Sequence, residues 1–195
     1  MVLTKVLNQR LVDTKKIMDV VVTCLVVVGA LFVPTFLAKI VPLGKYTQFV
    51  IGTIVNASLI TTAIYTKGTF KTLCIATLPS ISTILGGLLF ANITLYSKFM
   101  IPAIWLGNFS LIFIYKYLFV GKKINYVITA LTAIVIKVSI IYSGFILMTN
   151  LINVPEIAKQ TLATSMGLTQ LITASCGSLL VFFITLNSKK NQKNI

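Results

Sequence analysis

The sequence lacks histidine altogether and contains only three acidic residues against seventeen basic ones. These absences exclude most of the chemistry that proteins build from titratable side chains. Metal sites draw their ligands from His, Cys, Asp and Glu, and the three cysteines fall on three different predicted helices without CxxC spacing. Catalysis needs a nucleophile with a base, or a metal, and the apolar segments offer Ser and Thr without His, Asp or Glu nearby. We therefore predict no metal site, no catalytic residue and no cofactor.

Two energy sources are missing as well. No GxxxxGK[ST] phosphate loop occurs, since Gly44-Lys45 and Gly121-Lys122 lack both the upstream glycine and the following Ser or Thr. Proton-coupled carriers usually hold Asp, Glu or His chains inside the membrane, and the apolar segments contain none. The chain alone is expected neither to hydrolyse ATP nor to pump by proton coupling.

What the sequence has in abundance is apolar residues, at 57% of the chain, with a mean hydropathy of +0.98. They form six long runs, each close to or above the roughly 20 residues of a membrane-spanning helix. The runs are Val20–Ala38, Tyr46–Thr66, Thr72–Ser97, Phe99–Tyr115, Tyr126–Met148 and Leu162–Asn187. They are continuous, whereas β-barrel spans would alternate over about 10 residues. We predict an all-α integral membrane protein, a bundle of six transmembrane helices forming one domain over residues 19–187.

The basic residues predict the orientation of this bundle, because Lys and Arg near span ends are retained in the cytoplasm. Twelve lie in the N-terminal segment, the second and fourth loops and the C-terminal tail, against four in the opposite loops. Both termini are therefore predicted to be cytoplasmic, in a multi-pass protein of the cell membrane. The net charge of +14 follows this pattern of loops and tails, so no nucleic-acid partner is predicted.

The two ends of the chain differ from the apolar domain. Residues 1–18 place Leu3, Val6 and Leu7 near one helical face with basic residues among the polar positions, which predicts an amphipathic helix on the cytoplasmic leaflet. Docking of this helix to a partner protein is an alternative that the sequence supports no better. Residues 188–195 form a basic cytoplasmic tail.

Lys137 is the one charged residue in the middle of a predicted span. A lone ammonium at this depth is costly, so it is expected to face the protein interior or a wet cavity and to mark a functional site. No carboxylate inside the membrane is available to pair with it, which makes an anionic ligand one candidate partner. The alternatives are a structural lysine that bonds helix carbonyls near Gly144 or Pro34 and a lysine kept neutral by burial.

Neutral polar and aromatic side chains gather in the predicted outer half of the spans and indicate a pocket that opens outward. Together with Lys137 the predicted substrate-binding residues are Trp105, Asn108, Gln170, Asn92 and Tyr142. Each has a simpler interpretation. Amides often join transmembrane helices by hydrogen bonds of about 0.6 to 2 kcal/mol, and a Trp is common at the membrane interface. In the pocket interpretation, Lys137 favours an anionic ligand group, and Trp105 and the tyrosines favour a flat or apolar portion.

Three segments resemble the substrate-binding S components of energy-coupling-factor (ECF) transporters for vitamins and micronutrients. The first runs from Leu78-Pro79-Ser80-Ile81-Ser82 to Gly86-Gly87, the second is Met100-Ile101-Pro102-Ala103-Ile104-Trp105-Leu106-Gly107-Asn108, and the third is Met166-Gly167-Leu168-Thr169-Gln170-Leu171-Ile172. They resemble parts of helices three, four and six of such proteins. The resemblance extends over about residues 20–184.

This resemblance implies a small-molecule capture protein whose outward pocket is formed mainly by helices four to six. It also implies a transmembrane coupling subunit and cytoplasmic ATPases as partners. Family members present an Ala-xxx-Ala stripe on helix one to the coupling subunit, and here the stripe reads Ala30, Pro34, Ala38, with proline at its centre. Two other classes remain open: a small channel or facilitator, and a structural or assembly subunit of a larger membrane complex.

Overall fold

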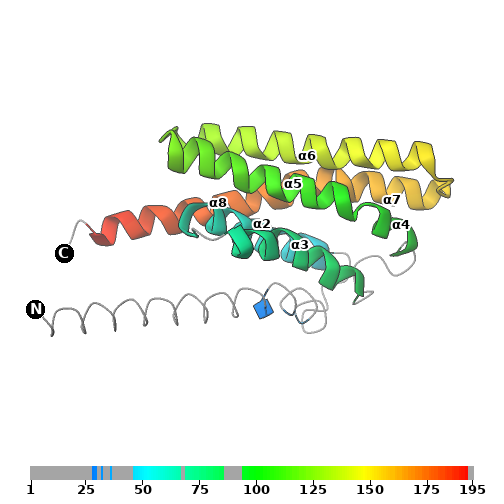
Figure 1. The fold of residues 1–195 in the computed structure, drawn as a ribbon, viewed down its shortest axis with the longest axis horizontal. Helices are drawn as coiled ribbons and strands as arrows, with labels where there is room; N and C mark the ends of the chain where they lie inside the picture. The colour runs from blue at the N-terminus through cyan, green and yellow to red at the C-terminus, as the bar shows by residue number, and fades with distance from the viewer. Residues whose placement is uncertain are drawn as a thin grey trace, which may run out of the picture.

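The computed structural model describes residues 46–66, 69–85 and 94–192, together with positions 28, 29, 32 and 36. Every regular element in these ranges is a helix, and no strand occurs among them, which confirms the all-α class. The elements, shown in Figure 1, are α2 (Thr47–Tyr65), α3 (Thr69–Leu85), α4 (Thr94–Phe99), α5 (Ile101–Ile114), the π-helix η2 (Tyr115–Gly121), α6 (Tyr126–Leu151), α7 (Glu156–Met166) and α8 (Leu168–Gln192).

Four stretches of the described chain are long and apolar enough to cross a membrane. They are Gln48–Tyr65, Ile101–Gly121, Tyr126–Leu151 and Glu156–Leu186. These stretches coincide with the second, fourth, fifth and sixth predicted spans. By length and composition the chain is therefore a multi-helix membrane protein, while the count of six spans and the orientation of the termini stay predictions.

The other two predicted spans fall partly or wholly outside the described residues. The predicted third span, Thr72–Ser97, begins inside α3 and ends inside the short helix α4, and residues 86–93 between them are not described. The predicted first span is described only at four isolated positions, and the amphipathic segment 1–18 lies outside the described part. At the other end, α8 continues to Gln192, through the first residues of the predicted tail.

Local sequence accounts for where the helices begin and change course. The Asn125 side chain accepts a hydrogen bond of 2.8 Å from the Val127 amide and so caps the start of α6. Pro102 occupies the first turn of α5, where its missing N–H has no helical partner to lose. Gly167 interrupts the last apolar stretch, since its backbone leaves the helical region and separates α7 from α8.

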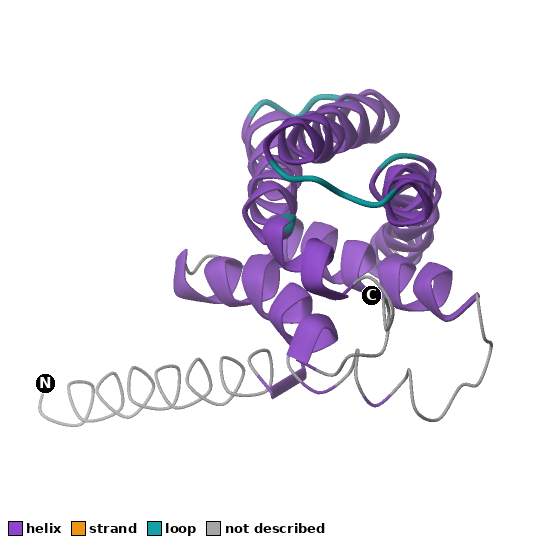
Figure 2. Cartoon of the chain, turned by 90° about the vertical axis from the view of Figure 1, so that its right-hand side faces the viewer, coloured by secondary structure: helices purple, strands orange, loops and turns teal. Residues whose placement is uncertain are grey.

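The helices form two closely packed pairs, α2 with α8 and α5 with α6, and α3 packs on both α2 and α5 (Figures 1 and 2). Glycine permits the close approach in each pair. A Cβ at Gly177 of α8 would lie 2.8 Å from the Ala57 backbone nitrogen of α2. A Cβ at Gly144 of α6 would overlap the Ala103 Cβ of α5.

Two apolar clusters hold these pairs together. The larger one lies towards the end of the bundle where α2 ends and α6 begins, and includes Leu59, Leu111, Tyr115, Ile134 and Val181, all buried. The smaller one joins the C-terminal half of α6 to α7 and the start of α5, through Met100, Ile141, Phe145, Met148, Leu162 and Met166. The space between this second cluster and the first half of α2 is where the candidate site lies.

Candidate functional site

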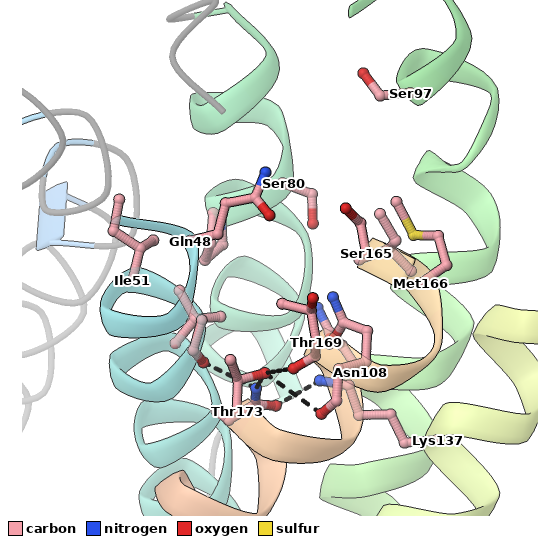
Figure 3. A pocket seen from close by; sticks show the side chains of 16 residues that line it. Gln48, Ile51, Ser80, Ser97, Asn108, Lys137, Ser165, Met166, Thr169 and Thr173 are labelled. Atoms are coloured by element: carbon pink, nitrogen blue, oxygen red, sulfur yellow. Dashed lines mark hydrogen bonds between the residues drawn. The ribbon is translucent and has the colours of Figure 1, made fainter. Parts of the chain in front are cut away.

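A pocket lies in the half of the bundle where α2, α5 and α8 begin and α3 ends (Figure 3). Its volume is about 110 Å³, and one water molecule needs about 10–15 Å³ by this measure, so several waters or one compact organic molecule would fit. The lining residues are Gln48, Ile51, Gly52, Val55, Asn56, Pro79, Ser80, Ser97, Ile104, Asn108, Lys137, Ser165, Met166, Thr169, Gln170 and Thr173.

Lys137 reaches this pocket from the middle of α6 and is almost fully buried, at 1% exposure. Its Nζ donates a hydrogen bond to Oδ1 of Asn56 on α2. Among the described residues this is the single partner of an ammonium that has three N–H donors. The lysine therefore keeps hydrogen-bonding capacity at the pocket.

The Asn56 amide is held in one orientation by its own neighbours. Its Nδ2 donates to the Gly52 carbonyl at 2.8 Å and to the Thr173 hydroxyl at 3.2 Å. The Thr173 hydroxyl in turn donates to the Thr169 carbonyl at 2.8 Å, so towards Asn56 it can only accept. A flipped amide would direct NH₂ at the ammonium and lose these contacts. Thr173 therefore fixes the amide so that its oxygen faces Lys137.

No carboxylate in the described part of the chain balances the Lys137 charge. Glu156 is the single acidic residue there, and it is exposed in the first turn of α7. The hydrogen-bond partner of Lys137 is not one that the sequence suggested. The partner is a neutral side-chain amide on α2, and among the described residues the ammonium bonds no helix carbonyl.

Three further polar side chains of the pocket have no hydrogen bond within the described residues. Ser165, at the end of α7, and Thr169, on α8, are buried, and Gln170 is half-buried. Most buried polar groups in proteins are hydrogen-bonded. Their unused donors and acceptors therefore give the pocket capacity for a polar ligand or for water.

Asn108 differs, because it is already used to join two helices. Its Nδ2 donates at 2.9 Å to the carbonyl of Ala76 on α3. The carbonyl of the preceding residue, Ile75, has no donor within the helix, because Pro79, four residues further on, lacks an N–H. Asn108 lines the pocket and also ties α5 to the proline-containing turn of α3.

The predicted site residues divide into three groups. Lys137, Asn108 and Gln170 line the pocket. Trp105 and Tyr142 are not among its lining residues. Tyr142 is 40% exposed and packs against Phe145 at 5.6 Å between ring centroids. The Trp105 Nε1 is buried without a hydrogen-bond partner in the described chain.

The remaining predicted residues, Asn92 and the docking stripe Ala30, Pro34 and Ala38, lie outside the described residues. The predicted substrate-binding residues did not include Asn56 or Thr173. A signal for Asn56 was present, since it falls halfway along its span, as Lys137 does. Thr169 and Thr173 are four residues apart and so share a helix face, but nothing in the sequence indicates that this face meets Asn56.

The opposite half of the bundle is filled by the larger apolar cluster and closed by hydrogen bonds between aromatic and hydroxyl groups. The Tyr126 hydroxyl donates to the Ser178 carbonyl at 2.7 Å, and the Tyr115 and Ser178 hydroxyls lie 2.9 Å apart. In the described residues the pocket therefore ends near Lys137 and does not continue through the bundle.

Neither a protein-family model, nor a curated protein, nor a solved structure matches this chain.

Proposed function

We propose that this protein is a membrane-embedded capture subunit for an anionic small molecule, of the kind that serves ECF-type uptake transporters. In this proposal the pocket binds the molecule from outside the cell. A transmembrane coupling subunit and cytoplasmic ATPases then supply the energy and the movement. The proposal combines the resemblance in three sequence segments with the pocket that the helices form.

The observation that carries the proposal is the buried Lys137 ammonium at the base of a pocket. It has one neutral partner, Asn56, and no carboxylate in the described chain. A charge in this position is costly unless it is paired. An anionic group on a ligand would supply the missing countercharge and accept the remaining N–H donors, as charge-assisted hydrogen bonds do.

The half of the bundle opposite the pocket is closed, which favours capture over conduction. A channel needs a continuous polar path. On the side of Lys137 away from the pocket, the described helices instead pack through apolar residues such as Leu59, Leu111 and Ile134. A protein that binds on one side and depends on partners for release fits this one-sided pocket. The absence of a phosphate loop from the sequence agrees with an ATPase on another chain.

One observation favours a second function, that of a structural subunit. The bond from Lys137 to Asn56 links α6 to α2 without any ligand, and such bonds can act solely to hold helices together. In that case the lysine would stabilise the fold or meet an acidic helix of a larger complex. Ligand binding by the purified chain separates the two functions.

The decisive experiment is native mass spectrometry of the purified protein, followed by binding measurements with the molecule that co-purifies. Lys137→Met keeps the length and apolar volume of the side chain. We expect it to lower affinity at least about 100-fold, since hydrogen bonds to charged groups contribute about 1.5–3 kcal/mol each, while the thermal midpoint in detergent stays equal or rises.

The matched control is Lys159→Met, which removes an equal charge from an exposed position on α7 and should leave affinity unchanged. A well-folded Lys137→Met protein with wild-type affinity would exclude the capture role of this lysine. Absence of any co-purifying or binding molecule, with a lowered thermal midpoint for Lys137→Met, would support the structural function instead.

A further inference from the structure

The pocket walls are aliphatic rather than aromatic. Ile51, Val55, Ile104 and Met166 provide the large apolar side chains, and among the described lining residues there is no Phe, Tyr or Trp. Trp105 and Tyr142, which the sequence suggested for contact with a flat ring, lie outside the lining. Stacking against an aromatic side chain, which commonly orients planar ligands, is therefore not available from the described walls.

The charge of the site restricts the ligand further. One ammonium lines the pocket, and no carboxylate in the described chain does. A single negative charge would neutralise Lys137. A second would remain uncompensated in a site of low polarity, and the ammonium of a zwitterion would be desolvated close to that of Lys137 with no acidic partner. Both carry a large cost.

The unused polar groups indicate what else the ligand carries. The side chains of Ser165, Thr169 and Gln170 belong to one short stretch across the α7–α8 junction, and Figure 3 shows Ser165 and Thr169 above Lys137 on the same side of the pocket. They have no hydrogen bond within the described residues. A ligand whose anionic end meets Lys137 could therefore place a neutral polar group next to this stretch.

From these three observations we infer that the pocket is built for a compact aliphatic monocarboxylate that carries at least one further neutral hydrogen-bonding group. The volume of about 110 Å³ fits a molecule with only a few carbon atoms. This inference rests on the proposed capture function and narrows its substrate class. It selects against aromatic, zwitterionic and dianionic molecules.

A matched series of small probes tests the inference on the full-length wild-type protein in detergent. The reference probe is 2-hydroxy-3-methylbutanoate. Its amide removes the charge, valine replaces the hydroxyl with an ammonium, mandelate replaces the isopropyl group with a phenyl ring, and 3-methylbutanoate removes the hydroxyl. Isothermal titration calorimetry should detect millimolar or tighter binding of the reference probe. The amide, valine and mandelate should each bind at least about tenfold more weakly, a difference of about 1.4 kcal/mol.

The hydroxyl group is tested by the last member of the series. We expect 3-methylbutanoate to bind several-fold more weakly than the reference probe in the wild type, and this preference should shrink in Ser165→Ala or Gln170→Leu. In Lys159→Met, the charge control, the order of affinities should stay that of the wild type. Because the series is measured on the wild type, its result does not depend on the folding of a Lys137 variant.

The outcomes separate this inference from the capture function itself. Equal or tighter binding of mandelate, valine or the amide overturns the inference, as does absence of binding by the reference probe. If the reference probe fails but a co-purified molecule binds in a Lys137-dependent manner, the inference fails and the capture function stands. If neither the probes nor any co-purified molecule bind, both fail.

Discussion

At the scale of single residues, the Asn56 side chain uses every one of its polar groups. Both amide N–H donors are bonded, to Gly52 and Thr173, and the amide oxygen accepts from Lys137. An amide held in this way presents a fixed dipole to the lysine. Unlike a carboxylate, it does not cancel the charge of the lysine. The arrangement keeps the ammonium inside the bundle and leaves it able to attract an anion.

Substitution of Thr173 tests whether its hydroxyl orients the Asn56 amide. In Thr173→Val the shape is kept, but the acceptor of the Asn56 N–H is lost, so the amide is no longer fixed. We expect a lower thermal midpoint, corresponding to about 0.5–2 kcal/mol, together with weaker anion binding. Thr173→Ser keeps the hydroxyl and should stay close to the wild type in both measurements. Equal behaviour of the Val and Ser variants would show that the hydroxyl does not orient Asn56.

At the scale of elements, the contact between α2 and α8 determines where Asn56 and Thr173 meet. Gly52 and Gly177 allow these helices to approach closely. A Cβ at Gly52 would lie 2.8 Å from Thr173 Cγ2, which belongs to a side chain, whereas one at Gly177 would lie 2.8 Å from the Ala57 backbone nitrogen. Backbone atoms cannot move aside as the end of a side chain can, so Gly177 is the more sensitive position.

Gly177→Ala should therefore push α8 away from α2. We expect a destabilisation of about 1–3 kcal/mol, seen as a lower thermal midpoint, and a loss of ligand affinity because Asn56 and Thr173 move apart. Gly29→Ala is the matched control, since a Cβ at Gly29 would meet nothing within 4 Å. If both variants have the thermal midpoint of the wild type, α2 and α8 can accommodate the added methyl group, and their close packing does not determine where Asn56 and Thr173 meet.

Sequence reasoning was most accurate for elements and least accurate for side-chain directions. Hydropathy located the stretches that became α2, α5, α6 and α8, because a long apolar run has few other stable forms in a membrane. The sequence also gives the positions of Lys137 and Gln170 along these stretches. Depth does not determine which way a side chain points around its helix. Trp105 and Tyr142 lie on the same helices as the lining residues Asn108 and Lys137, yet neither lines the pocket.

At the scale of the whole molecule, the two ends of the bundle differ in chemistry. One end holds the pocket, and the other carries the exposed Lys122 and Lys123 in the loop between η2 and α6. Basic loops are retained in the cytoplasm, so the pocket is predicted to open outward. The orientation itself is the part of this argument that has to be measured.

Cysteine labelling can measure it at the two ends of α6. In a background without native cysteines, Asn153→Cys and Lys122→Cys each place a thiol in an exposed loop. In intact cells a membrane-impermeant maleimide should label position 153 and not position 122, and permeabilisation should make both reactive. Labelling of position 122 alone in intact cells would reverse the predicted topology and place the pocket on the cytoplasmic side.

The separation into two helix pairs has a mechanical consequence. Hydrogen bonds join the α2–α8 pair to the α5–α6 pair at Ser178, through Tyr115 and Tyr126, and again at the bond between Lys137 and Asn56. Thr169 lies nine residues before Ser178 on α8, or about 14 Å at 1.5 Å per residue. If the two pairs tilted by about 5° about the contacts at the tyrosines, they would separate by about 1.2 Å at the level of Thr169. The bond between Lys137 and Asn56 joins the two pairs nearer the pocket, so we expect a ligand that draws the ammonium away from Asn56 to weaken the contact between them there.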